Sequence, residues 1–390
     1  MSDAIPASFT LDLRLPCRIV CAPGARREIG PLARSLGQRA FLVHGSRTLS
    51  RCGVYEELAE HLASQGVEVI ATIEARGEPT IEDVDRAAVE LFDFEAGHGD
   101  LVIAIGGGAA IDLAKAAAAM AVTGKDDSVR DYLEGIGRGQ TLEHPPLPIL
   151  AMPTTGGTGS EATRNAVISC PDPPCKKSLR HDGLLPRIVV IDPELAVHAP
   201  PPVTAHSGMD AITQLIESYL TPRGNLLTYQ LCVEGLRLAL QALPEAYSNG
   251  QSIPARMEMA QAALLSGVAL ANSGLGMAHG VAAALGAMCN VPHGLACAVM
   301  LPVTLRANLV TSEYSLDTLA EQVGINDAHA LIDEIEELAA QLEIPTRLGA
   351  LGVRREQLPA LAAASRGNSM SGNPRTLSDD ELVRILEDNL

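Results

Sequence analysis

A loop of glycine and hydroxyl-bearing residues directly follows a short apolar run in this chain. Residues 153–161 read PTTGGTGSE, and the apolar run 147–152 precedes them. Glycine lets a backbone come close to a ligand, and Thr and Ser add hydroxyl donors. A loop of this kind at the end of a buried strand indicates a site for a phosphate or for the amide of a nicotinamide.

A second glycine loop lies upstream, where the apolar run 101–105 leads into three glycines and a helix-like segment to residue 120. Free backbone N–H groups and the helix dipole suit a pyrophosphate at such a helix start. Asp112 and Lys115 share one face of this helix. Alone, the loop is equally well interpreted as a tight strand–helix turn with a surface ion pair. Two such junctions in one half of the chain indicate a nucleotide site.

Composition narrows the class of protein. A chain of 390 residues is long enough for two domains, since single cores rarely grow beyond about 250–300 residues. Aromatic residues make up only 3%, so aliphatic side chains must fill the core. A net charge of −18 argues against nucleic acid and anionic membranes as partners and favours a small-molecule enzyme.

Cysteine spacing and the N-terminus bear on the compartment. The 8 cysteines include no CxxC pair, which argues against zinc-ribbon and thioredoxin-like sites and favours reduced thiols. Residues 1–10 lack a basic region followed by an apolar run. We also expect no transmembrane helix, which needs roughly 18 uncharged apolar residues. The protein is therefore expected to be cytoplasmic.

The two glycine loops require strands to carry them. Short β-branched runs alternate with amphipathic segments, which predicts a parallel, doubly wound, Rossmann-like sheet with ligands at the carboxyl ends of its strands. Thr80 with Asp83 forms a partial capping box before one helix. Strands are predicted at 40–44, 67–71, 101–105, 148–152 and 188–192, and helices at 55–65 and 81–95.

The pattern changes after Asp192-Pro193-Glu194. Ala/Leu-rich segments at helical spacing replace the β-branched runs, and three prolines at 200–202 mark the seam. We therefore expect an α/β domain over 1–193 and an all-helical domain over 194–390. Helices are predicted at 205–220, 226–242, 253–271, 279–289, 302–309, 315–322 and 328–342.

Five motifs in order give a more specific signal. They are GGGxxxDxxK at 106–115, PTTxGTGSE at 153–161, DPEL at 192–195, GMDA at 208–211, and HG followed by PHG at 279–294. Together they resemble the iron-containing (group III) alcohol dehydrogenase family, and residues 373–375 (NPR) resemble its C-terminal part. The resemblance implies a dehydroquinate synthase-like architecture, with a dinucleotide-binding domain and a helical metal and substrate domain.

The resemblance also implies the cofactor contacts. Lys176 and Lys177 are not separated by sequence alone, although the spacing from Thr154 favours Lys176. Ser46 takes the place of an acidic residue that holds the adenosine ribose, which removes repulsion toward a 2′-phosphate, and Arg47 adds attraction. NADP is therefore expected to be tolerated beside NAD. The remaining implied cofactor residues are Gly106, Gly107, Gly108, Ala109, Asp112, Thr154, Thr155, Thr158 and Asn165.

The implied metal site departs from the family. Asp210, His279 and His293 match three ligands, but Gln214 stands where the family has a fourth, a histidine, and Ala283 replaces a histidine often assigned to proton relay. A Gln carbonyl oxygen is a weaker donor than imidazole, so Fe²⁺ or Zn²⁺ is expected to bind less tightly and Mn²⁺ to compete better.

Other side chains near this site have simpler interpretations. His206, four residues before Asp210, is either an added imidazole or acid/base group or a partly solvated residue just ahead of a helix start. Cys289 and Cys297 are interpreted as pocket lining.

The resemblance implies an NAD(P)-dependent, metal-assisted oxidoreductase that acts on CH–OH and interconverts a small alcohol and its carbonyl compound. Its catalytic residues would be Asp210, His279, His293 and His206. Three alternatives stay open: a metal-independent reductase resembling maleylacetate reductases, a lyase resembling the sugar-phosphate cyclases, and an inactive binding protein. The family commonly forms dimers or larger assemblies, which predicts a homodimer or larger homo-oligomer.

Overall fold

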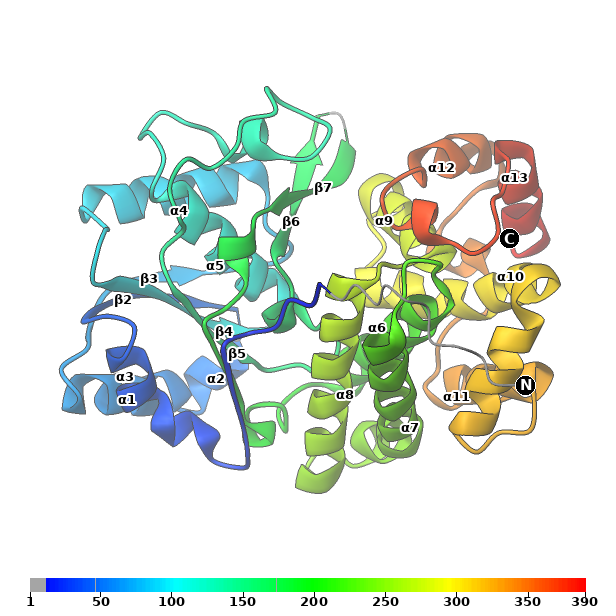
Figure 1. Ribbon diagram of the computed structural model, residues 1–390, viewed down its shortest axis with the longest axis horizontal. Coiled ribbons are helices and arrows are strands. Elements are labelled where there is room, and N and C mark those ends of the chain that lie inside the picture. Colours follow the sequence, from blue (N-terminus) through cyan, green and yellow to red (C-terminus); the bar gives the residue numbers. More distant parts are fainter. Residues whose placement is uncertain (1–11, 46, 173) are drawn as a thin grey trace, which may run out of the picture.

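A six-stranded parallel sheet forms the N-terminal half of the protein. The structure, a computed structural model, describes residues 12–45, 47–172 and 174–390. All pairings in this sheet are parallel and its order is β1-β8-β5-β4-β2-β3, which confirms the predicted doubly wound α/β fold (Figure 1). The strands are β1 Arg18–Cys21, β2 Arg39–His44, β3 Glu68–Glu74, β4 Asp100–Gly106, β5 Ile149–Pro153 and β8 Ile188–Ile191.

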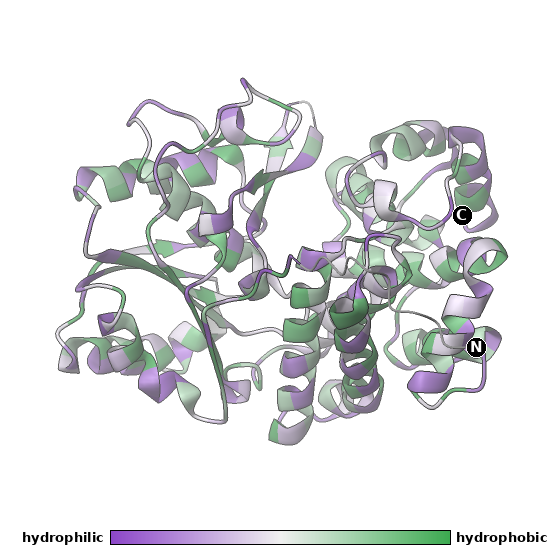
Figure 2. Ribbon diagram, viewed as in Figure 1, coloured by the Kyte–Doolittle hydropathy of each residue, from purple (hydrophilic) through white to green (hydrophobic). Residues whose placement is uncertain are grey.

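Helices cover both faces of the sheet because its strands are apolar on both sides. Along β2, Phe41 and Val43 face one core, whereas Ala40 and Leu42 face the other. The first core includes residues of α4 and α5, and the second includes residues of α1 and α3. Figure 2 shows both hydrophobic and hydrophilic residues on these covering helices. Their bounds are α1 Ile29–Arg34, α2 Arg47–Arg51, α3 Val54–Ser64, α4 Ile81–Asp93 and α5 Gly108–Met120.

An antiparallel hairpin that the sequence did not predict extends from this half. It consists of β6 Asn165–Pro171 and β7 Pro174–Arg180. β7 has no β-branched residue and β6 has only Val167 and Ile168, so the usual strand signal is weak. The hairpin packs on α5 through β6 and on α9 (Met277–Cys289) through β7. It therefore connects the sheet half to the helical half. The short edge strand β1 was also not predicted.

The C-terminal half is helical, as predicted, but the bounds of its helices differ from the predicted ones. Segments 302–309 and 315–322 were expected as two helices and are parts of one, because Pro302 lies inside α10 instead of starting a helix. Pro201 and Pro202 open α6 with the fixed φ that suits a first turn. The C-terminal helices α12 and α13 were not predicted. The bounds are α6 Pro201–Leu220, α7 Leu226–Ser248, α8 Ile253–Asn272, α9 Met277–Cys289, α10 His293–Gln322, α11 Ala328–Gln341, α12 Leu358–Ala364 and α13 Asp379–Asp388.

One helix of this half has the length and composition of a membrane span, which the sequence analysis did not expect. It is α10, with 30 residues, and 61% of its most apolar window is buried within the protein. Residues of α10, including Val299, Leu301 and Leu305, belong to the core of the helical half. Its apolar character is therefore accounted for by packing against other helices of the protein.

Candidate functional site

The two glycine-containing loops lie side by side at the carboxyl edge of the sheet. Gly106, at the end of β4, is in register with Pro153, at the end of β5. A Cβ atom on Gly108 would lie 2.5 Å from Thr158 Oγ1, so only glycine lets the two loops approach this closely. Gly159 has a φ of +59°, and a Cβ there would lie 2.5 Å from Gly267 Cα of α8. The glycines thus bring the loops together and press the second loop against the helical half.

Two cavities open beside these loops, and most of the predicted site residues line one or both of them. The first, of about 520 Å³, is lined by Gly107, Ala109, Thr154 and Thr155 among others. The second, of about 550 Å³, lies between the two halves of the chain. Its lining includes five further cofactor candidates and the four metal candidates: Gly108, Asp112, Thr158, Asn165, Lys176, Asp210, Gln214, His279 and His293. Among the described residues, Gly106 lines neither cavity.

Asp112 and Lys115 do not form a surface ion pair, so that interpretation is wrong. Lys115 is 0% exposed, and its Nζ donates to the carbonyl oxygens of Ser160, Thr163 (2.8 Å) and Asn165 (3.0 Å). The Asp112 carboxylate accepts from the Ser160 hydroxyl and from the Val167 N–H at 3.1 Å. Burial lowers the pKa of Lys115 to about 8. These two side chains anchor the second loop and the start of β6 to α5.

Lys176 projects into the second cavity from β7. Its Nζ forms an ion pair with Glu78, and its side chain is only 8% exposed. Lys177 lines the same cavity, so position alone does not exclude it. Asn165 starts β6 and lines the cavity as predicted. Ser46 lies outside the described residues.

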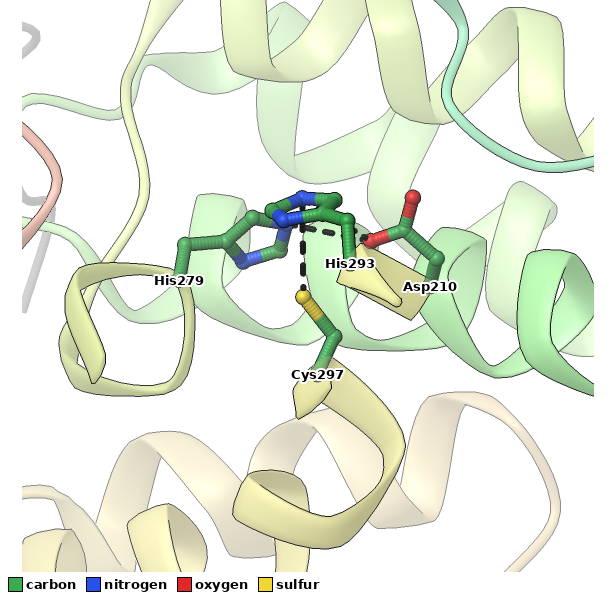
Figure 3. A group of neighbouring side chains, drawn as sticks. All are labelled: Asp210, His279, His293 and Cys297. Carbon is green, nitrogen blue, oxygen red and sulfur yellow. Dashed lines mark hydrogen bonds and ion pairs between the residues drawn. The ribbon is translucent and has the colours of Figure 1, made fainter. Parts of the chain in front are cut away.

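The metal candidates come together from three helices. Asp210 lies on α6, His279 on α9, and both His293 and Cys297 on α10, with one donor atom of each within 4.8 Å of the others. Figure 3 shows these four side chains pointing toward one another. Asp210 Oδ1 lies 3.3 Å from His279 Nε2 and 3.8 Å from His293 Nε2. Cys297 Sγ lies 3.7 Å from His293 Nε2. Cys297 was expected to line the pocket, but among the described residues it lines neither cavity and belongs to the donor group instead.

The buried donor atoms of this cluster fit a bound cation. Asp210 Oδ1 and His279 Nε2 are buried and have no hydrogen-bond partner among the described residues, although Asp210 is 1% and His279 4% exposed. Unsatisfied buried polar atoms are costly, and a divalent metal ion between them would satisfy both. One carboxylate oxygen and two imidazole nitrogens are donors that transition metals prefer. The residues present therefore fit a metal ion.

Glu217, which the sequence analysis missed, fixes the orientation of His279. Its carboxylate accepts from His279 Nδ1 at 2.7 Å and from the Ala278 N–H at 2.6 Å. Burial opposes a charge on His279, but Cys297 and the carboxylates of Asp210 and Glu217 raise its pKa well above the usual value. The sequence held a signal for Glu217, since it follows Asp210 by seven residues, two helical turns along α6.

Gln214 does not present its oxygen to this cluster. Its Oε1 accepts from the Ser266 hydroxyl at 2.7 Å. Its Nε2 lies 3.3 Å from both the Thr158 carbonyl oxygen and Asp210 Oδ2, and donates to them. The amide is therefore already bonded at both ends, and ligation by Gln214 stays a prediction.

Three further residues singled out in the sequence, His206, Asn373 and Ala283, have positions that only the structure reveals. His206 lies inside α6 rather than ahead of its start, and among the described residues it lines neither cavity. Burial lowers the pKa of His206. Asn373, from the NPR motif, accepts at Oδ1 from the Met277 N–H at 3.1 Å and so fixes the start of α9. Ala283 lines the second cavity.

The family models for the iron-containing alcohol dehydrogenases match nearly the whole chain. The model described as "Iron-containing alcohol dehydrogenase" matches residues 16–193, and the model "Fe-containing alcohol dehydrogenase family, C-terminal" matches residues 204–390.

The similarity to known alcohol dehydrogenases extends over almost the entire length of both chains. The long-chain-alcohol dehydrogenase 1 of Geobacillus thermodenitrificans is 32% identical, with 93% of each chain covered. The NAD-dependent methanol dehydrogenase of Bacillus methanolicus is 30% identical, covering 96% of this chain and 99% of that one. The crystal structure of a 1,3-propanediol oxidoreductase superposes with a TM-score of 0.90 at 30% identity, covering 98% of this chain and 100% of that one.

Proposed function

Because the chain belongs to the iron-containing alcohol dehydrogenase family, we propose that it is an NAD(P)-dependent, metal-assisted dehydrogenase of small alcohols and reductase of the matching aldehydes. One observation carries this proposal. The second cavity is lined both by loop residues of the sheet half, such as Thr158, and by the cluster of Asp210, His279 and His293. A nicotinamide and a substrate oxygen would therefore meet in one cavity.

The chain's own residues would divide the work between the two halves. We propose residues 1–193 as the dinucleotide-binding unit and 194–390 as the metal and substrate unit. Gly106, Gly107 and Ala109 let the pyrophosphate approach the N-terminus of α5, where no side chain of the described residues caps the helix at Gly107. Thr154, Thr155, Thr158, Asn165 and Lys176 position the ribose and nicotinamide, and Asp112 holds the second loop in place.

Asp210, His279 and His293 would hold the metal ion, and Glu217 keeps the His279 ring turned toward it. When bound, the nicotinamide accepts or donates the hydride and the metal ion polarises the substrate oxygen. The protein contributes alignment and a partly enclosed cavity. Ala283 offers no side chain for proton relay, and His206 lines neither cavity among the described residues, so the proton leaves through water or the ribose hydroxyl.

The finer assignments follow from the same residues. Fe²⁺ or Zn²⁺ is the proposed metal, with Mn²⁺ as a competitor. NAD and NADP are both proposed to be used, with Ser46 in place of an acidic residue. A cytoplasmic homodimer or larger homo-oligomer is proposed from the family resemblance.

The metal-independent alternative has one observation in its favour, which is that both ends of the Gln214 amide are already bonded. Against it stand Asp210 Oδ1 and His279 Nε2, two buried atoms that have no hydrogen-bond partner among the described residues.

Metal removal separates the two. The purified protein would be stripped with a chelator and assayed for NADH and NADPH oxidation with a panel of small aldehydes, before and after addition of Fe²⁺, Zn²⁺ or Mn²⁺. Loss of activity on stripping and its return with metal supports the metal-assisted enzyme. Activity that persists in protein free of metal supports the alternative, and no oxidation under any condition refutes both.

A further inference from the structure

The fourth donor of the metal site is not determined by Asp210, His279 and His293 alone. The family resemblance puts Gln214 at that position. The structure puts a second candidate there, because Cys297 completes the group of donor atoms that lie within 4.8 Å of one another.

The Gln214 amide is held in an orientation unsuited to ligation. If the amide were turned over, Oε1 would face the Thr158 carbonyl oxygen and Asp210 Oδ2, the two acceptors that Nε2 now contacts at 3.3 Å. Two acceptors in contact repel each other, and no proton is available between them. In its present orientation Oε1 is occupied by the Ser266 hydroxyl at 2.7 Å. The amide therefore supports Asp210 by donating to it.

Cys297, in contrast, has the position of a ligand. It follows His293 by four residues on α10, so both side chains lie on one face of that helix. Donors bound at 2.0–2.3 Å around a tetrahedral zinc ion lie roughly 3.3–3.8 Å apart. The separations of 3.3 Å for Asp210–His279, 3.8 Å for Asp210–His293 and 3.7 Å for His293–Cys297 fall in this range.

Cys297 also approaches the cluster from the side away from the cavity. Its side chain is fully buried, and among the described residues it is not part of the cavity lining, whereas Asp210, His279 and His293 are. Figure 3 shows the Cys297 sulfur below the ring of His293, with Asp210 to one side of that ring. A fourth donor from this side leaves the cavity face of the metal open for a substrate oxygen.

We propose that the Cys297 thiolate, and not Gln214, is the fourth metal ligand, and that this donor set selects Zn²⁺ over Fe²⁺. The inference rests on the proposed metal-assisted function. As the metal–sulfur bond forms, the thiol releases its proton to solvent. Thiolate is a softer donor than imidazole or an amide oxygen, and it favours Zn²⁺ over Fe²⁺, Mn²⁺ or Mg²⁺ at a site of otherwise similar geometry.

Cobalt substitution tests the ligand directly, without an activity assay. The stripped protein would be loaded with Co²⁺, its metal content measured, and its absorption spectrum recorded. A bound thiolate gives an intense thiolate-to-cobalt charge-transfer band in the near ultraviolet. We expect this band in the native sequence and in Gln214→Leu, and its loss in Cys297→Ser. Cys289→Ser is the matched control, since Cys289 is a half-buried cysteine of α9 outside the cluster, and it should keep the band.

Metal selectivity gives a second readout. With Zn²⁺ and Fe²⁺ offered together under anaerobic conditions, the native protein should take up zinc. Mutation of residues that only support a metal ligand weakens metal binding by roughly 10–100-fold. Cys297→Ser, which removes a ligand itself, should weaken zinc binding by at least as much, and its iron content should rise.

The proposal is overturned if the native protein binds cobalt without the band, or if Cys297→Ser keeps it. Either result leaves the metal-assisted dehydrogenase intact. Failure of the native protein to bind any metal overturns this proposal and the metal-assisted function together. If Cys297→Ser does not fold, the spectra of the native protein and Gln214→Leu still decide the question.

Discussion

Glu217 Oε2 lies 2.7 Å from His279 Nδ1, while His279 Nε2, on the other side of the ring, lies 3.3 Å from Asp210 Oδ1. The imidazole is therefore held between a carboxylate that accepts a hydrogen bond from Nδ1 and the other donor atoms of the proposed metal site, which Nε2 faces. A carboxylate in this position fixes the ring tautomer and makes the nitrogen a stronger donor.

Replacing Glu217 with Gln should weaken metal binding by roughly 10–100-fold, because the amide no longer accepts a charge-assisted hydrogen bond from His279. The measurement is the dissociation constant for Zn²⁺ by competition with a chromogenic chelator. Glu337→Gln, at an exposed carboxylate of α11, is the control and should bind zinc like the native protein. An unchanged zinc affinity in Glu217→Gln contradicts a role for this carboxylate in orienting His279.

Replacing Gly108 with Ala should impair cofactor binding, because the added methyl group would lie 2.5 Å from Thr158 Oγ1 and force the two loops apart. Overpacking of this kind costs about 1–3 kcal/mol, so the dissociation constant for NADH should rise by about tenfold or more. Fluorescence titration with NADH measures it. Gly97→Ala is a suitable control, since a Cβ there meets nothing closer than 4.0 Å. Equal NADH affinity in both variants would show that the loop contact is not needed.

The two adjacent lysines of β7 should differ in function. Lys176→Met should raise KM for the cofactor or substrate by about tenfold, since it removes a cation that is buried against Glu78 at the cavity wall. Lys177→Met is the paired control and should change KM by less. Steady-state kinetics with each cofactor gives both numbers, and a larger effect of Lys177→Met would reverse the assignment.

Glu161 should make stability depend on pH. Burial raises the pKa of its carboxyl from 4.5 to about 7. The folded protein then binds more protons than the unfolded chain between about pH 4.5 and 7, so this group's contribution to stability falls as pH rises through that window. At pH 8 the buried charge costs up to about 3 kcal/mol, taking about 1.4 kcal/mol per pKa unit.

Glu161→Gln removes this titration, so its urea midpoint relative to the native protein should be higher at pH 8 than at pH 5. Urea unfolding at both pH values, with metal and cofactor held constant, measures the difference. Glu337→Gln again serves as the exposed control. If the urea midpoints of Glu161→Gln and the native protein differ by the same amount at both pH values, the carboxyl pKa of Glu161 is not raised.

The cofactor half of the site was readable from the sequence because its signals are local. The glycine loops after β4 and β5 each follow an apolar strand directly, so the strand, the turn and the ligand-binding end are encoded within about fifteen residues. The capping box of α4 is equally local, and the structure contains both of its hydrogen bonds, Thr80 N–H to Asp83 and Asp83 N–H to Thr80.

The metal half was less readable because its geometry depends on how three helices meet. Asp210, His279 and His293 were identified through the family resemblance, whereas Cys297 has no pattern of its own and its place beside His293 depends on where α10 begins. The sequence pattern does not predict that start, because it places no helix between residues 289 and 302. Lys176 lies on β7, which carries no β-branched residue, so its place in the cavity followed only from the fold.

The hydrogen bond from Gln214 to the Thr158 carbonyl oxygen also joins the sheet half to the helical half at the wall of the second cavity. The same amide donates to Asp210, so a shift of the Thr158 loop on binding of the proposed dinucleotide would change the support of a proposed metal ligand. Thermodynamic linkage then requires reciprocity: the factor by which the dinucleotide changes metal affinity equals the factor by which the metal changes dinucleotide affinity. Gln214, at the position of an expected metal ligand, would thus couple the binding of the dinucleotide to the binding of the metal ion.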